Sequence, residues 1–284
     1  MANKNTAWAW KNKDESKAKA IAHNKEMIEK YESASKYAAM NSIIYKEDFS
    51  YSSETPGIIP RIRLIKTDTI RCIDVARYAI PKKERSVRGL LETDKAKICI
   101  LNFASFKNPG GMFLNGSMAQ EEALCHASNL YNILSDDVIF DNFYAENRKS
   151  LNKALYHNRA VYTPGLLVFI PKDHGTHQDS VDVLTCAAPN YSAAHRYQNI
   201  SQEECNKVMA SRIKYILDIM EANKVDIPIL GAFGCGVFGN DPKFVAEEFQ
   251  RCLKSFDYNF SYVLFAVPGG INFKYFEDVL TNGE

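Results

Sequence analysis

The stretch Asn102–Tyr131, NFASFKNPGGMFLNGSMAQEEALCHASNLY, decides the fold prediction because it combines a strand end, a turn-rich loop and a helix. The near-continuous apolar run Ile98–Phe103 is typical of a strand buried on both faces of a sheet. Asn108–Gly111 (NPGG) and Asn115–Gly116 predict tight turns. Apolar residues then recur at helical spacing, which predicts a helix over 118–134.

Two adjacent carboxylates, Glu121 and Glu122, fall in the first turn or so of this helix, where Ser117 and Gln120 also predict a capping box. Acidic residues suit a helix N-terminus, so a purely structural role is one interpretation. Neighbouring carboxylates also repel, which can raise the pKa of one of them, and a glycosidic acid catalyst requires a raised pKa. Because the pair follows a glycine loop at a strand end, where α/β folds bind ligands, we predict a catalytic site here.

A second glycine-rich stretch, Gly231–Pro242 (GAFGCGVFGNDP), lies between an apolar run and a predicted helix. Gly234, Gly236 and Gly239 match the G-x-G-x-x-G pattern of dinucleotide-binding folds. Glycines let backbone N–H groups surround an anion beside a helix N-terminus. A Rossmann fold places this pattern in its first βαβ unit, whereas only one helix and one clear strand remain downstream here. Taken alone, the loop leaves a tight turn and an anion site equally open.

The rest of the chain alternates between strand-like and helical patterns, which predicts an α/β sheet with helices on both faces. Residues 14–48 contain no Gly or Pro and predict one or two amphipathic helices, so we divide the chain into an N-terminal helical extension (1–60) and a main domain (61–284). Residues 172–180 predict a polar loop. Strands are predicted over 61–66, 98–103, 166–170, 181–186, 227–232 and 262–267, and helices over 68–80, 118–134, 201–223 and 242–254.

Composition excludes several classes of protein. The 284 residues carry a net charge of +1, so bulk electrostatics predicts neither specific nucleic-acid binding nor membrane binding. No apolar run approaches the roughly 20 residues of a membrane span, and the polar start does not resemble a secretory signal. The seven scattered cysteines form no C-x-x-C pair, which predicts reduced thiols and an intracellular (cytoplasmic) location. No sequence pattern indicates the oligomeric state, and a monomer is the expectation. His174 and His177 lack partners at metal-ligand spacing, so no metal is expected.

The stretch 102–131 resembles the signature of microbial-type poly(ADP-ribose) glycohydrolases, in which Gln-Glu-Glu follows a glycine triplet after several residues. Here Gly110–Met112 is followed, after seven residues, by Gln120–Glu122. The stretch 231–242 resembles the second phosphate loop of that family, and Lys66–Thr69 and Ala187–Asn190 resemble further strand-end segments. The resemblance runs in order from about residue 10 to about residue 280. It implies a macrodomain-like three-layer α/β fold with a mixed central sheet flanked by helices.

The resemblance also implies an activity, namely hydrolysis of the ribose–ribose O-glycosidic bond of poly(ADP-ribose), without a metal or other cofactor. Glu122 corresponds to the acid/base of the family, and Glu121 to the residue that holds ribose hydroxyls. Gln120 would support the loop geometry, with a capping role and direct ligand contact as alternatives. Gly110 and Gly111 would let their loop approach the diphosphate and the distal ribose.

The remaining binding residues also come from the resemblance. Asn102 would lie near the distal ribose, and Phe238 would pack on the adenosine side of the ligand or in the core. Asp68 would bind the adenine amino group or cap the helix that follows it. The backbone N–H groups of the second phosphate loop would bind phosphate; they belong to Gly234, Cys235, Gly236 and Val237.

Met112 stands where the family signature has its third glycine. A side chain there could impose a different backbone conformation or crowd the ribose. This departure motivates an alternative, an ADP-ribose reader with little turnover. Hydrolysis of mono-ADP-ribosylated proteins is a further alternative, and an NAD dehydrogenase is the outlying one. The expected partners are poly(ADP-ribose) or ADP-ribose, and ADP-ribosylated proteins.

Overall fold

The computed structural model describes residues 4–53, 56–88 and 95–281, with side chains from Lys13 onwards. In this part of the chain, seven strands form one mixed sheet in the order β1-β4-β5-β3-β6-β7-β2. Strands β5, β3, β6, β7 and β2 run parallel to one another. Strand β4 is antiparallel to both β1 and β5. The strand bounds are β1 (Ile43–Tyr45), β2 (Arg61–Ile65), β3 (Ile98–Phe103), β4 (Ala160–Lys172), β5 (Gly175–Cys186), β6 (Ile227–Leu230) and β7 (Tyr262–Ala266).

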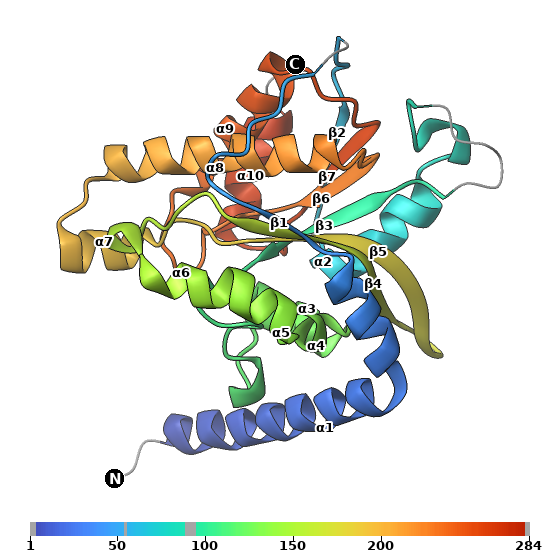
Figure 1. Ribbon diagram of the computed structural model, residues 1–284, viewed down its shortest axis with the longest axis vertical. Helices are drawn as coiled ribbons and strands as arrows, with labels where there is room; N and C mark the ends of the chain where they lie inside the picture. Colours follow the sequence, from blue (N-terminus) through green and yellow to red (C-terminus); the bar gives the residue numbers. More distant parts are fainter. Residues whose placement is uncertain (1–3, 54–55, 89–94, 282–284) are drawn as a thin grey trace.

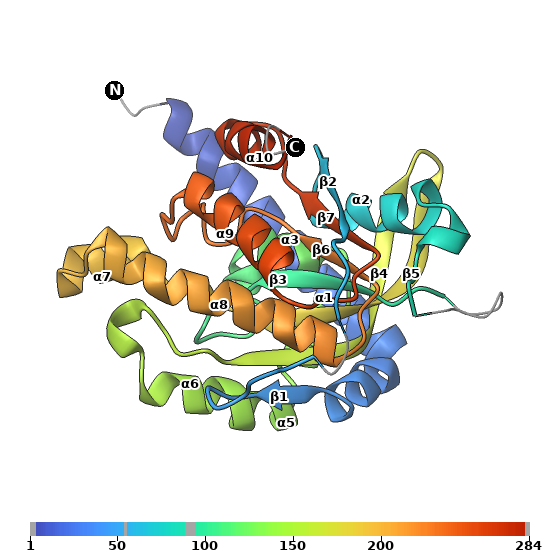
Figure 2. The ribbon, with the colours of Figure 1, turned by 90° about the horizontal axis from the view of Figure 1, so that it is seen from above.

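Helices cover both faces of the sheet, which confirms the predicted three-layer α/β fold (Figures 1 and 2). One face carries α1 (Lys4–Met40), α2 (Thr69–Asp74), α3 (Gln120–His126) and α4 (Leu130–Leu134). The other carries α8 (Gln202–Ala222), α9 (Pro242–Ser255) and α10 (Ile271–Thr281). The remaining α-helices of the described residues are α5 (Asp137–Ile139), α6 (Ala145–Lys149) and α7 (Tyr191–Gln198).

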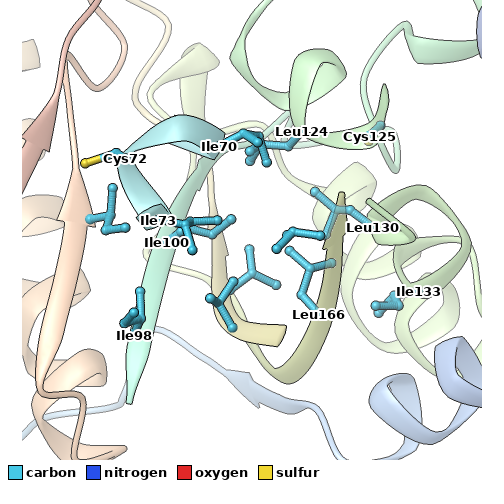
Figure 3. Packing of buried hydrophobic residues seen from close by; sticks show 14 of the residues in the cluster. Ile70, Cys72, Ile73, Ile98, Ile100, Leu124, Cys125, Leu130, Ile133 and Leu166 are labelled. Atoms are coloured by element: carbon cyan, nitrogen blue, oxygen red, sulfur yellow. The ribbon is translucent and has the colours of Figure 1, made fainter. Parts of the chain in front are cut away.

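The alternation of side chains along the strands builds a separate core on each face. Ile98 and Ile100 of β3 pack into the cluster under α2, α3 and α4, as Figure 3 shows. Cys99 and Leu101 point the other way, into the cluster under α8 and α9. Successive residues of a strand point to opposite faces, so a continuous apolar run places a strand between two helix layers.

The N-terminal segment departs from the prediction in one respect. Helix α1 ends at Met40, and Ile43–Tyr45 then form the edge strand β1, so the predicted helix through residue 48 is wrong beyond Met40. Pairing with the free edge of β4 satisfies the backbone of these β-branched and aromatic residues. The helix itself kinks at Tyr31 and buries small residues such as Ala20 and Ala38 against the domain.

Two further predictions were wrong. Residues 172–180 are not a loop, because the β4–β5 hairpin continues through them as far as the pair Lys172↔Gly175. This end of the hairpin is largely exposed, so its side chains are polar and hide the strand pattern. The predicted helix 118–134 is two helices, α3 and α4, because Ser128 forms a β-bridge with Val168 between them.

Within the described ranges, none of the helices combines the length and the apolar character needed to cross a bilayer. The seven cysteines are free thiols, as predicted, and six of them are buried.

Candidate active site

A cavity of about 770 Å³ opens where the carboxyl ends of several strands meet. Its walls come from the start of α2, the end of β3, the first turns of α3, the second glycine loop and the segment after β7. Of the residues predicted from sequence, six line it: Asp68, Gln120, Gly234, Gly236, Val237 and Phe238. The other six do not: Asn102, Gly110, Gly111, Glu121, Glu122 and Cys235. Both glycine-rich stretches nevertheless meet at this end of the sheet. Gly111 contacts the first turn of α3, and Gln120 of the same turn faces the cavity.

The carboxylates of Glu121 and Glu122 lie beside the cavity, 3% and 7% exposed, under the first glycine loop. Gly111 adopts a left-handed conformation (φ +57°), and a Cβ there would lie 2.5 Å from Glu122 Oε1 and 3.1 Å from Glu121 Oε2. The backbone of the loop therefore covers both carboxylates. Glu122 Oε1 accepts the Met112 N–H at 2.9 Å, so Glu122 faces the loop and not bulk solvent.

Burial dominates the chemistry of Glu121. It raises the pKa of this carboxyl to about 8. The hydrogen bonds from the Ser105 N–H (2.7 Å) and the Asn102 side-chain amide (3.2 Å) favour the charged form and lower the pKa, but burial has the larger effect. The charge of Glu122 raises the pKa further. A neutral Glu121 beside a second carboxyl can donate a hydrogen bond as well as accept one.

The stability of the protein should fall as pH rises from about 4.5 to about 8 because of Glu121. The unfolded carboxyl loses its proton near pH 4.5 and the folded one near 8, so the folded state holds one more proton within this window. The contribution of Glu121 to the free energy of unfolding is complete below pH 4.5. It decreases by about 1.4 kcal/mol per pH unit for one proton and is lost once the pH exceeds the pKa of the folded state. Denaturant titrations of the wild type and Glu121→Gln across this window should show a shallower pH dependence in the variant. Equal slopes would contradict the raised pKa.

Asn102 and Gln120 form a layer behind the carboxylates. Asn102 is fully buried and donates to Glu121 Oε1 (3.2 Å) and Thr185 Oγ1 (3.3 Å), so it lies behind Glu121 and not in the cavity wall. The Gln120 amide accepts the Phe103 N–H (2.8 Å) and donates to Leu101 O (2.9 Å) at the end of β3. The predicted capping box is therefore wrong: α3 has no side-chain cap, because the amide binds β3 instead.

The second glycine loop offers fewer backbone donors than predicted. The Cys235 N–H already donates to Ala232 O at 3.1 Å, which removes it from the expected set. The N–H groups of Gly234, Gly236 and Val237 make no hydrogen bond to any residue that the structure describes, and Val237 is 85% exposed. These three groups are thus available to an anion in the cavity.

Asp68 and Phe238 each combine a structural contact with a place in the cavity wall. Asp68 caps α2 by accepting the Arg71 N–H (2.9 Å) and pairs with the Arg71 guanidinium (2.6 Å), while it also lines the cavity. Phe238 is half-buried, packs 6.3 Å from the ring of Tyr156, and lines the cavity as well.

Several cavity residues were missed from the sequence. Phe103, Ala266 and Pro268 follow or end buried strands, and this position at strand ends was the available signal. His126 and Pro171 carried no such signal, because only the packing of α3 beside the hairpin brings them to the cavity. Among the described residues, no three His, Cys, Asp or Glu side chains come together as a metal site.

Comparison with known proteins identifies the family. Residues 15–170, more than half of the chain, match the catalytic domain of microbial-type PARG, that is, poly(ADP-ribose) glycohydrolase. A search of curated proteins gave no significant match. Among solved structures, poly(ADP-ribose) glycohydrolase from Thermomonospora curvata is 27% identical, with a TM-score of 0.75, covering 93% of this chain and 98% of that one.

Two further structures agree. The Deinococcus radiodurans enzyme in complex with ADP-ribose is 26% identical with a TM-score of 0.73, covering 87% of this chain and 97% of that one. The Thermomonospora curvata enzyme bound to the inhibitor ADP-HPD is 27% identical with a TM-score of 0.72, covering 93% of this chain and 98% of that one. These matches set the NAD dehydrogenase alternative aside. The chain belongs to the microbial-type poly(ADP-ribose) glycohydrolase family, whose fold is macrodomain-like.

Proposed function

We propose that this chain hydrolyses the ribose–ribose O-glycosidic bond of poly(ADP-ribose) and releases ADP-ribose, with Glu122 as the acid/base. The observation that carries the proposal is the position of Glu122. Its carboxyl is fixed by the Met112 N–H under the first glycine loop, on the helix turn that borders the cavity. No hydrogen bond to its other oxygen is found within the described residues, so that oxygen remains for the substrate.

In the proposed reaction, protonated Glu122 gives its proton to the leaving 2′-oxygen as the bond between that oxygen and C1 of the distal ribose breaks. The sugar passes through an oxocarbenium-like state, which the new carboxylate stabilises. This carboxylate then takes a proton from water as the water oxygen bonds to C1, and Glu122 is protonated again. One carboxyl thus serves both steps, while Glu121, held by Ser105 and Asn102, positions ribose hydroxyls.

The cavity would hold the released ADP-ribose. The three available N–H groups of the second glycine loop would bind its diphosphate, while Asp68 would take its adenine and Phe238 would pack on its adenosine side. Gly110 and Gly111 would let the opposite loop approach the distal ribose. All cavity residues fall within 68–272, which supports the proposed division into an extension (1–60) and a catalytic domain (61–284).

The proposed partners are ADP-ribosylated proteins that carry the polymer, and the proposed state is a monomer. Free, mostly buried thiols support an intracellular, cytoplasmic location.

Incubation of the purified protein with poly(ADP-ribose) and, separately, with a mono-ADP-ribosylated protein tests this function. Chromatography should detect free ADP-ribose released from the polymer. Calorimetry with ADP-ribose completes the test. Tight binding without release from either substrate would identify a reader instead, and release from the mono-modified protein alone would identify a different hydrolase.

A further inference from the structure

The first glycine loop contacts Glu122 without forming part of the cavity wall. Met112 donates its N–H to Glu122 Oε1 at 2.9 Å, yet Asn108–Met112 contribute no residue that lines the cavity. If the released ADP-ribose fills the cavity, the group that leaves must lie on the far side of the carboxyl that protonates it. The loop, with Met112 nearest to that carboxyl, borders this side.

Met112 offers an exposed side chain in addition to the backbone N–H that binds Glu122. Gly110 and Gly111 have left-handed φ angles of +61° and +57°, whereas Met112 has φ −112°, which a side chain tolerates. The backbone of Met112 therefore carries no left-handed strain, while the expectation that it differs from the backbone of the family's third glycine stays a prediction. Met112 is 52% exposed, with Sδ 3.8 Å from Asn115 Nδ2, so the residue whose N–H binds Glu122 also carries an exposed apolar side chain.

Two cations lie at the first glycine loop: Lys107 directly precedes Asn108, and Arg148 comes from helix α6. Arg148 donates from Nε to Lys107 O (3.0 Å) and from Nη2 to Asn108 Oδ1 (3.1 Å), so it is attached to the loop. The Lys107 and Arg148 side chains are exposed, and neither forms an ion pair with an acidic side chain of the described residues. Lysine and arginine are the side chains that bind phosphate groups.

We propose that Met112, Lys107 and Arg148 form a leaving-group subsite for the polymer unit that precedes the scissile bond. Met112 contacts the adenosine whose 2′-oxygen takes the proton from Glu122, and the two cations bind the diphosphate of the same unit. This inference rests on the proposed function and assigns the polymer specificity of the site to these side chains. A substrate with a small uncharged leaving group would not use the cations.

Met112→Gly tests the apolar part. We expect kcat/KM on poly(ADP-ribose) to fall about tenfold, as for the loss of an apolar contact that discriminates substrates, while the Kd for ADP-ribose stays unchanged. Met112→Leu, which keeps most of the volume, should retain most of the activity. If polymer turnover is unchanged in Met112→Gly, or falls only by the same factor as the affinity for ADP-ribose, the assignment of Met112 to a leaving-group subsite is refuted.

Lys107→Gln tests the charged part, with Lys82→Gln, an exposed lysine after α2, as its matched control. The slope of log kcat/KM against log salt on the polymer should become shallower by about 0.7 in Lys107→Gln only. ADP-ribose carrying a 4-nitrophenyl group at C1 of the distal ribose lacks the second diphosphate, so its turnover should respond equally in both variants. Equal salt slopes on the polymer would overturn the assignment. Failure of the wild type on any polymer would instead refute the proposed function.

Discussion

Glu122→Gln should lower kcat on poly(ADP-ribose) by about 10³-fold, within the range of general acid–base catalysis. The amide has nearly the shape of the carboxyl and can still accept the Met112 N–H, but it can neither give a proton to the leaving oxygen nor take one from water. Initial rates of ADP-ribose release, at saturating polymer, measure the effect. Binding of ADP-ribose should remain, because the cavity wall does not include this side chain.

The control for this variant is Glu203→Gln. Glu203 also lies in the first turn of a helix, α8, but its side chain is 81% exposed. If Glu122 only complemented the helix dipole, both substitutions would reduce stability to a similarly small extent, and neither would affect turnover. Undiminished turnover in Glu122→Gln would remove Glu122 from the proposed mechanism.

Gly111→Ala should reduce turnover by about 10²-fold or more, because a displacement of about 1 Å at reacting groups has an effect of this size. The new Cβ would lie 2.5 Å from Glu122 Oε1 and 3.1 Å from Glu121 Oε2, so both carboxylates would have to move. The left-handed backbone adds a conformational penalty of about 1–2 kcal/mol. Rates of ADP-ribose release and thermal unfolding together separate the two effects.

Gly165→Ala is the matched control. Gly165 has φ +75°, so it carries the same kind of backbone penalty, but an added Cβ there meets no atom within 4 Å. We expect a similar loss of stability in both variants and a loss of turnover only in Gly111→Ala. Equal turnover in the two variants would show that contact between the loop and the carboxylates is unimportant for catalysis.

Local sequence patterns predicted most of the architecture. The apolar runs at β3, β6 and β7 were read correctly, because a strand buried between two helix layers must be apolar on both faces. The edge strand β2 was predicted correctly from its alternating pattern. The exposed end of the β4–β5 hairpin escaped prediction, because strands without a buried face carry no apolar pattern. Strand β1 was missed since its only partner, β4, lies far away in the sequence.

The site divides in the same way. Sequence by itself placed Glu121 and Glu122 at a helix start after a glycine loop, since turns and helix starts are set by neighbouring residues. Tertiary contacts were needed to show that burial raises the pKa of Glu121, that Asn102 lies behind it and that the Cys235 N–H is already used. Desolvation and hydrogen-bond partners depend on segments that folding brings together, and no local pattern records them.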